Sequence, residues 1–153
     1  MRLFVGIPPA SEVLNELSEA VARLRLPQDG LRWTTPESWH ITLQFLGNTD
    51  QQHCDCVLER LKEIRAAKFE VRLGELGFFD RAGVFFLDVV PSADLVELAK
   101  RVTAATAKCG FAAEARPYHP HITLARAKGE NKGRQMHALQ ERLRGNRTLA
   151  IHS

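Results

Sequence analysis

The stretch HITLQFLG occupies residues 40–47, and HITLAR occupies residues 121–126, 81 positions further along the chain. A protein of 153 residues therefore contains His-Ile-Thr-Leu twice, once in each half. Successive side chains alternate between the two faces of a strand, so in each copy His and Thr share one face while Ile and Leu point into a core. The sequence predicts two polar pairs, His40 with Thr42 and His121 with Thr123.

Strands alternate with amphipathic helices around the two copies. Ser11 is a predicted N-cap, Ser92 begins a predicted helix that ends at Gly110, and Asp80–Gly83 has the composition of a hairpin turn. The last segment, TLAI at 148–151, is typical of the beginning of a strand. The expected strands are 2–7, 31–33, 40–47, 69–79, 84–90 and 121–127. The expected helices are 11–24, 50–67, 92–110 and 134–144, with a single helical turn at 35–37.

Both halves share one order of elements: a helix, a connector that contains proline, a His-Ile-Thr-Leu strand and another helix. This order indicates an internal duplication of one α/β unit, with a period too long for a solenoid repeat. The fold class is therefore predicted as α/β (α+β). Two units related by approximate two-fold symmetry would bring the two polar pairs together across a central cleft.

Composition limits the class of protein. A length of 153 residues suits one domain, and 44% hydrophobic with 25% charged residues is typical of a globular protein without a membrane span. The N-terminus lacks a signal-peptide core, so we expect a cytoplasmic protein. A net charge of +3 suits an anionic ligand but does not by itself indicate nucleic acid. Cys54, Cys56 and Cys109 lack zinc or redox-motif spacing, and all three are expected to be reduced.

The paired histidines suggest a chemistry. Hydrolysis of a phosphodiester without a metal needs one neutral imidazole to take a proton from water and one protonated imidazole to give a proton to the leaving oxygen. The two threonine hydroxyls would hold the non-bridging phosphate oxygens. A single His on a strand is usually structural, but strand propensity alone does not explain the same tetrapeptide at equivalent positions of a duplicated unit.

The two motifs, together with RLFVGIPP at the N-terminus and the context PHITLAR, resemble the two-histidine phosphoesterases over nearly the whole chain. More narrowly, they resemble the RNA 2′,3′-cyclic phosphodiesterases, also named 2′-5′ RNA ligases. The resemblance implies a single bilobal domain over 1–153, in which two intertwined lobes contribute one motif each. It also implies two antiparallel sheets lining a central cleft with helices outside.

The resemblance also implies a reaction: metal-independent hydrolysis of a terminal 2′,3′-cyclic phosphate to a 2′-phosphate, with a reversible 2′-5′ RNA ligase reaction. By the same resemblance His40 is the proton donor and His121 the proton acceptor. The expected partners are RNA with 2′,3′-cyclic phosphate ends or small cyclic nucleotides. We expect no cofactor, no metal and no membrane partner, and a monomer. The alternative is a non-catalytic module that binds nucleotides or RNA ends in the same cleft.

Phe45 and Arg126 both lie five residues after a motif His. The resemblance assigns Phe45 to the terminal nucleoside and Arg126 to phosphate, which suits an aromatic face and a planar guanidinium. In a regular strand Phe45 would face away from His40, so its role requires a bend or bulge. The alternatives are that Phe45 fills the core and that Arg126 is a solvated surface residue.

Other candidate functional residues have weaker support in the sequence. His119 has no partners at zinc spacing, so no metal site is predicted there. Trp33, Trp39, Tyr118 and Arg32 precede motif strands, where loops would line the cleft, although each Trp is expected to pack beneath its loop. The basic turn Lys128–Arg134 would meet an RNA backbone or remain a solvated loop.

Overall fold

The structure is a computed structural model that describes residues 1–144. The strand predicted at 148–151 lies outside these residues. The strands are β1 (Arg2–Ile7), β2 (Leu31–Trp33), β3 (Ile41–Asn48), β4 (Leu73–Phe79), β5 (Val84–Val89) and β6 (His121–Ala127). The helices are α1 (Ser11–Leu24), the short 3₁₀ helix η1 (Pro36–Ser38), α2 (Gln51–Lys62), α3 (Ala93–Ala107) and α4 (Lys132–Arg144). Within residues 1–144 no helix is long and apolar enough to cross a membrane.

Element types match the prediction, while several boundaries differ. Asp50 and Ser92 cap α2 and α3, accepting hydrogen bonds from the amides of His53 and Leu95. The prediction that Ser11 caps the first helix was wrong, because Ala10 occupies the N-cap position and provides no side-chain acceptor. Helix α2 ends at Lys62 instead of Ala67, and the amides of Glu63 and Ile64 bond three residues back, to the carbonyls of Arg60 and Leu61.

The chain folds as two compact units. Unit 1 comprises residues 1–7, 41–71 and 90–120, and unit 2 comprises residues 8–40, 72–89 and 121–144 of the part that is described. In unit 1, β1 and β3 form a two-stranded antiparallel sheet, α3 packs against β3, and α2 packs against α3.

A disulfide joins Cys56 on α2 to Cys109, two residues beyond α3. The prediction of three reduced cysteines was therefore wrong for this pair, and Cys54 alone keeps a free thiol. The spacing rules used for the prediction concern neighbouring cysteines, whereas these partners lie 53 residues apart and meet only because α2 and α3 pack together.

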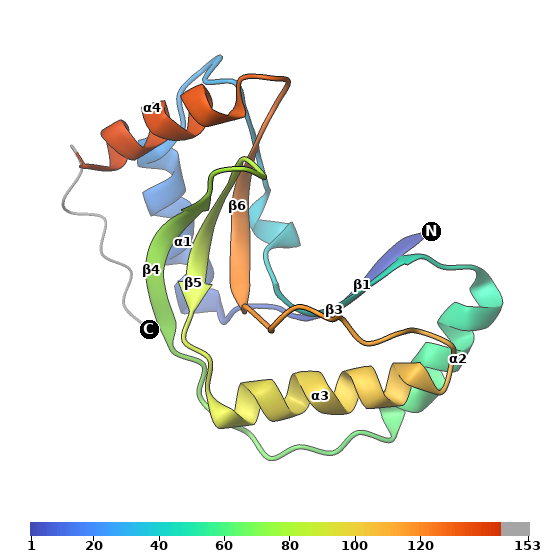
Figure 1. Ribbon diagram of the computed structural model, residues 1–153. Coiled ribbons are helices and arrows are strands. Elements are labelled where there is room, and N and C mark those ends of the chain that lie inside the picture. The colour runs from blue at the N-terminus through green and yellow to red at the C-terminus, as the bar shows by residue number, and fades with distance from the viewer. Residues whose placement is uncertain (145–153) are drawn as a thin grey trace. The chain divides into compact units, whose positions relative to one another are not determined.

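Unit 2 is built on a four-stranded antiparallel sheet in the order β2-β6-β5-β4. Figure 1 shows β4, β5 and β6 side by side, with α4 running across one end; α4 contacts both α1 and β6. The structure thus confirms a mixed α/β fold with four α-helices and two antiparallel sheets in the described residues.

The two faces of the four-stranded sheet differ in composition. One face, here called the core face, carries side chains that are almost fully buried: Trp33, Phe85, Leu87, Ile122, Leu124 and Ala125. The opposite face, here called the motif face, carries Phe79, Phe86, His121 and Thr123, of which the first three are in mutual ring contact. The second His-Ile-Thr-Leu copy therefore points its His and Thr to the motif face, as strand alternation predicts.

Candidate active site

The predicted site residues are divided between the two units. The boundary falls inside the first motif, between His40 and Ile41. Thr42 and Phe45 lie in unit 1, on β3. Unit 2 holds the other four predicted residues: His40, His121, Thr123 and Arg126. Whether each lobe of a single domain supplies one motif stays a prediction.

A bulge interrupts β3 immediately after Thr42. Gly6 of β1 pairs with Thr42 and the preceding Val5 pairs with Gln44, so Leu43 is an extra residue without a partner of its own. Leu43 and Gln44 are consecutive and both buried, and Phe45 is 63% exposed. A bulge of this kind resets the alternation of faces by one residue. Phe45 therefore lies on the same face as Thr42, as its predicted role requires.

An equivalent bulge interrupts β6 at the equivalent position of the second copy. Thr123 pairs with Phe86 and Ala125 with Phe85, which leaves Leu124 as the extra residue. Leu124 and Ala125 are both fully buried, and Arg126 is exposed. Arg126 therefore joins Thr123 on the motif face. The duplication extends beyond the four identical letters to the geometry of the strand that follows them.

His121 is packed by aromatic rings. Its imidazole lies edge-on to Phe79 and Phe86, with ring centroids 5.3 and 5.4 Å away, and these two phenyl rings stack on each other at 4.1 Å. Gly77 on β4 makes room for this cluster, because a Cβ there would come within 2.8 Å of the Phe86 ring. His121 thus occupies a position fixed by neighbouring rings, with a half-buried side chain.

His40 is oriented by the chain just before it. Its Nδ1 lies 2.6 Å from the Ser38 carbonyl oxygen, and because a carbonyl only accepts, Nδ1 carries the proton. The next residue back, Trp39, is 3% exposed and donates from Nε1 to Thr34 Oγ1 at 2.7 Å. Thr34 Oγ1 in turn donates to the Thr123 carbonyl at 2.9 Å. Two hydrogen bonds thus connect the residue before His40 to the second-motif threonine.

The first-motif threonine is held by Tyr118. The Tyr118 hydroxyl donates to the Thr42 carbonyl at 2.7 Å, and both residues belong to unit 1. Burial raises the pKa of Tyr118 to about 12, so the phenol keeps its proton at neutral pH. The sequence placed Tyr118 only near a motif strand; the structure shows it bonded to the motif backbone.

The structure also gives the burial and contacts of the other residues near the two motifs. Trp33 and Trp39 are buried, as predicted. Phe45 meets Phe4 of β1 edge-on, at 6.4 Å between centroids. His119 is exposed, and within residues 1–144 no group of three or more His, Cys, Asp and Glu side chains could hold a metal ion.

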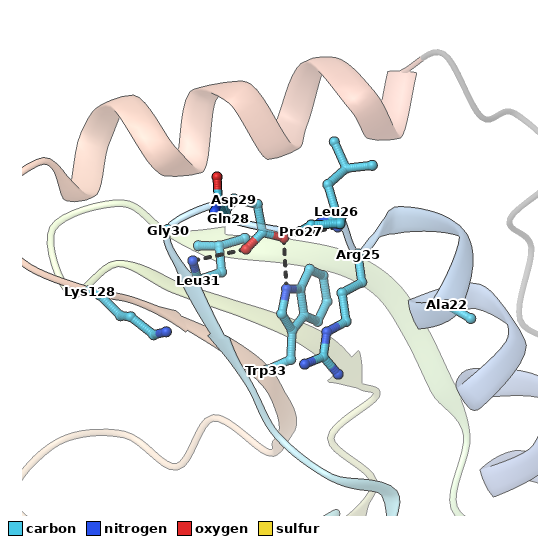
Figure 2. Close-up of a pocket in the computed structure, with 10 residues that line it drawn as sticks. All are labelled: Ala22, Arg25, Leu26, Pro27, Gln28, Asp29, Gly30, Leu31, Trp33 and Lys128. Atoms are coloured by element: carbon cyan, nitrogen blue, oxygen red, sulfur yellow. Dashed lines mark hydrogen bonds between the residues drawn. The ribbon is translucent and has the colours of Figure 1, made fainter.

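A cavity of about 590 Å³ lies in unit 2, around the turn that leads into β2 (Figure 2). Asp29 lies in its wall and accepts hydrogen bonds from Trp33 Nε1 and from the amides of Leu26 and Leu31. Burial would raise the pKa of the Asp29 carboxyl, but these hydrogen bonds and the nearby Arg142 outweigh it and hold the pKa below its usual value. These contacts join the turn to Trp33 of β2 and to Arg142 of α4, so we assign Asp29 a structural role.

Comparison with known proteins places this architecture in a family. Residues 12–150 match the 2′-5′ RNA ligase superfamily. The chain is 33% identical to the RNA 2′,3′-cyclic phosphodiesterase of Aeropyrum pernix, over 86% of this chain and 73% of that protein. It is 31% identical to the RNA 2′,3′-cyclic phosphodiesterase of Bacillus subtilis, over 80% of this chain and 69% of that one.

Solved structures of similar proteins support the same family. The crystal structure of E. coli LigT complexed with 3′-AMP superposes with a TM-score of 0.74 at 29% identity, covering 85% of this chain and 75% of LigT. A two-sheet α/β protein with paired His-x-Thr strands is the class that the fold and motifs define. The chain belongs to the 2′-5′ RNA ligase superfamily of two-histidine phosphoesterases.

The residues that orient the two histidines were not predicted from the sequence. Ser38 acts through its main-chain carbonyl, which carries no sequence signal. Thr34 is an unremarkable strand-end residue, and its partners lie 89 and 90 positions away. Gly77 and Phe86 belong to a strand pair that was predicted, but their proximity to His121 depends on the order of strands in the sheet.

Proposed function

We propose that this protein is a metal-independent RNA 2′,3′-cyclic phosphodiesterase that opens a terminal 2′,3′-cyclic phosphate to a 2′-phosphate. One observation carries the proposal: both His-x-Thr copies adopt the same bulged strand geometry, which turns the threonine and the residue three positions later to one face. Two relatives that share about a third of their residues with this chain are named RNA 2′,3′-cyclic phosphodiesterase.

The proposed reaction uses the two histidines as a proton relay. His121 Nε2 or Nδ1 takes a proton from water, the water oxygen bonds to phosphorus, and the bond from phosphorus to the 3′-oxygen breaks. His40 protonates that 3′-oxygen from Nε2, since its Nδ1–H is engaged by the Ser38 carbonyl. The products are a 2′-phosphate and a 3′-hydroxyl, and the proposed reaction uses no metal or cofactor.

The remaining predicted residues bind substrate in this proposal. Thr42 and Thr123 donate hydroxyl hydrogen bonds to non-bridging phosphate oxygens, and Arg126 adds a positive charge to the phosphate. Phe45 stacks on the terminal nucleoside, a role that suits a ring that is 63% exposed. The protein acts as a monomer on RNA ends or small cyclic nucleotides.

The same bond changes allow a ligase reaction. If the 5′-hydroxyl of a second RNA replaces water, attack on the cyclic phosphate and loss of the 3′-oxygen leave a 2′-5′ phosphodiester. Reversal of that step regenerates the cyclic end. We include this reversible reaction in the proposal because the matched superfamily is described as 2′-5′ RNA ligase.

The test uses an oligoribonucleotide ending in a 2′,3′-cyclic phosphate, incubated with EDTA. Wild-type protein should yield the 2′-phosphate, and His40→Ala and His121→Ala should each lower kcat by about 10²–10⁴. His137→Ala is the matched control, since His137 is an exposed histidine on α4 and should leave kcat unchanged.

The pH dependence of kcat gives a second readout. An acid–base pair predicts a bell-shaped profile, of which each alanine variant loses one limb. Binding of the RNA end without product at any pH would replace the proposal with the non-catalytic binding module. Loss of turnover in EDTA that returns with a divalent cation would refute the metal-independent mechanism.

A further inference from the structure

Two arginines stand directly opposite each other in the sheet of unit 2. Arg32 of β2 pairs with Arg126 of β6, and directly paired residues of antiparallel strands point to the same face. Their neighbours Trp33 and Ala125 are buried on the core face. Arg32 therefore lies on the motif face, next to Arg126 and on the same side of the sheet as His121 and Thr123.

This pair is unfavourable for the isolated fold. The Cβ atoms of directly opposite residues lie about 5 Å apart, where like charges repel. Both side chains are exposed, and across residues 1–144 neither guanidinium has a carboxylate within ion-pair distance. Other arginines of the described chain, such as Arg101 and Arg142, do lie near carboxylates. Binding of one phosphate by Arg126 and of a neighbouring phosphate by Arg32 would offset this repulsion.

We propose that Arg32 binds the backbone phosphate that links the terminal nucleoside to the preceding nucleotide of an RNA substrate. This inference rests on the proposed function, which assigns the scissile phosphate to the histidines, threonines and Arg126. Arg32 lies one strand further from β5 than Arg126, on the edge strand of the sheet. An RNA chain that crosses the β2 edge brings its next phosphate to Arg32, and a guanidinium holds a phosphate with two parallel hydrogen bonds.

The consequence is a preference for polymer ends over mononucleotides. A mononucleoside 2′,3′-cyclic phosphate lacks the second phosphate, so Arg32 has nothing to hold. An oligoribonucleotide with a cyclic end has it, and so does a mononucleoside 5′-phosphate 2′,3′-cyclic phosphate. Arg32 is in this account a specificity residue.

The experiment compares kcat/KM on these three substrates for wild type, Arg32→Gln and Arg32→Lys. Arg32→Gln should lower the ratio of oligoribonucleotide to mononucleoside turnover about tenfold, as expected for loss of one charge-assisted contact. The 5′-phosphorylated mononucleotide should show the same loss, and Arg32→Lys should recover part of it. Arg23→Gln, which removes an exposed charge from α1 in the same unit, should leave the ratio unchanged.

Stability provides an independent control. Removal of one of two opposed like charges should not lower the melting temperature of Arg32→Gln below that of wild type. An equal loss on all three substrates would overturn the proposal, because it would place Arg32 at the scissile phosphate or in the fold. No change on any substrate would overturn it as well.

A binding measurement distinguishes failure of this inference from failure of the proposed function. If wild type turns over none of the substrates, the proposed function fails, and fluorescence anisotropy with an oligoribonucleotide ending in a 2′-phosphate still tests Arg32. Loss of one phosphate contact should reduce the slope of log affinity against log salt by about 0.7 for a single strand. An unchanged slope would overturn the contact.

Discussion

At the residue scale, both motif threonines are held through their main-chain carbonyls by a hydroxyl from elsewhere in their own unit. Tyr118 donates to the carbonyl of Thr42, and Thr34 donates to that of Thr123. The two donors differ in residue type and in position relative to the motif. The duplicated strands therefore use different side chains to satisfy the same backbone position.

Tyr118 permits a direct pH measurement, since it is the only tyrosine in the chain. Its pKa is raised from 10.0 to about 12 by burial, so the unfolded chain loses this proton first as the pH rises. The stabilisation from the neutral phenol is complete below pH 10 and is lost as the pH rises toward 12. The phenolate difference spectrum should therefore titrate near 12 in the folded protein and near 10 in denaturant.

Tyr118→Phe tests what that hydroxyl contributes. Loss of its bond to Thr42 should lower the free energy of unfolding by about 1 kcal/mol and remove the decline between pH 10 and 12 that belongs to this group. Denaturant unfolding at pH 8 and at pH 11 measures both effects. A phenolate that titrates at the same pH in folded and denatured protein would contradict the burial of this hydroxyl.

At the element scale, the two bulges decide which residues share the motif faces. Sequence patterning predicted β3 and β6, their polar pairs and the need for a bulge before Phe45 could join Thr42. The position of the extra residue could not be predicted, because Leu43 and Leu124 look like ordinary strand residues. Register is fixed by the partner strands β1 and β5, and that pairing is a property of the folded sheet.

Gly77→Ala tests the aromatic packing around His121. The added Cβ would lie 2.8 Å from Phe86, so the ring must move, and with it the contacts to Phe79 and His121. We expect a loss of about 1–3 kcal/mol in the free energy of unfolding and a lower kcat with a smaller change in KM.

Two further variants serve as controls for Gly77→Ala. Gly133→Ala adds a methyl group to α4 where nothing lies within 4 Å, and it should stabilise the protein by about 0.5–1 kcal/mol. Phe86→Leu in the Gly77→Ala background relieves the contact and should recover part of the stability. If Gly77→Ala matches Gly133→Ala in both kcat and stability, the ring cluster does not position His121.

At the scale of the whole molecule, the Cys56–Cys109 disulfide closes a loop with a sequence separation of 53. This loop leaves unit 1, forms β4 and β5 of unit 2, and returns. In the chain-entropy description a loop of this length stabilises the folded state by about 4 kcal/mol. Disulfides are uncommon in reducing compartments, so the redox state of this pair tests the cytoplasmic location, which stays a prediction.

Thiol counting tests the bond. Denatured protein kept from reductant should expose one reactive thiol, that of Cys54, and three after reduction with a dithiol. Reduction should also lower the melting temperature, whereas Cys54→Ser should leave it unchanged. Three thiols before reduction would contradict the disulfide.

The paired bulges at Leu43 and Leu124 have a consequence for how this chain tolerates change in length. Each extra residue shifts by one position the alternation of side chains between the two faces of its strand. Deletion of Leu43 would remove the bulge between Thr42 and Phe45 and send Phe45 to the face opposite Thr42, while the second irregularity of β3, at Leu46, would remain. Deletion of Leu124 would move Arg126 from the motif face of β6 to the core face. A substitution in these strands alters one side chain, but loss of a bulge residue reverses the faces of the side chains that follow it up to the next irregularity.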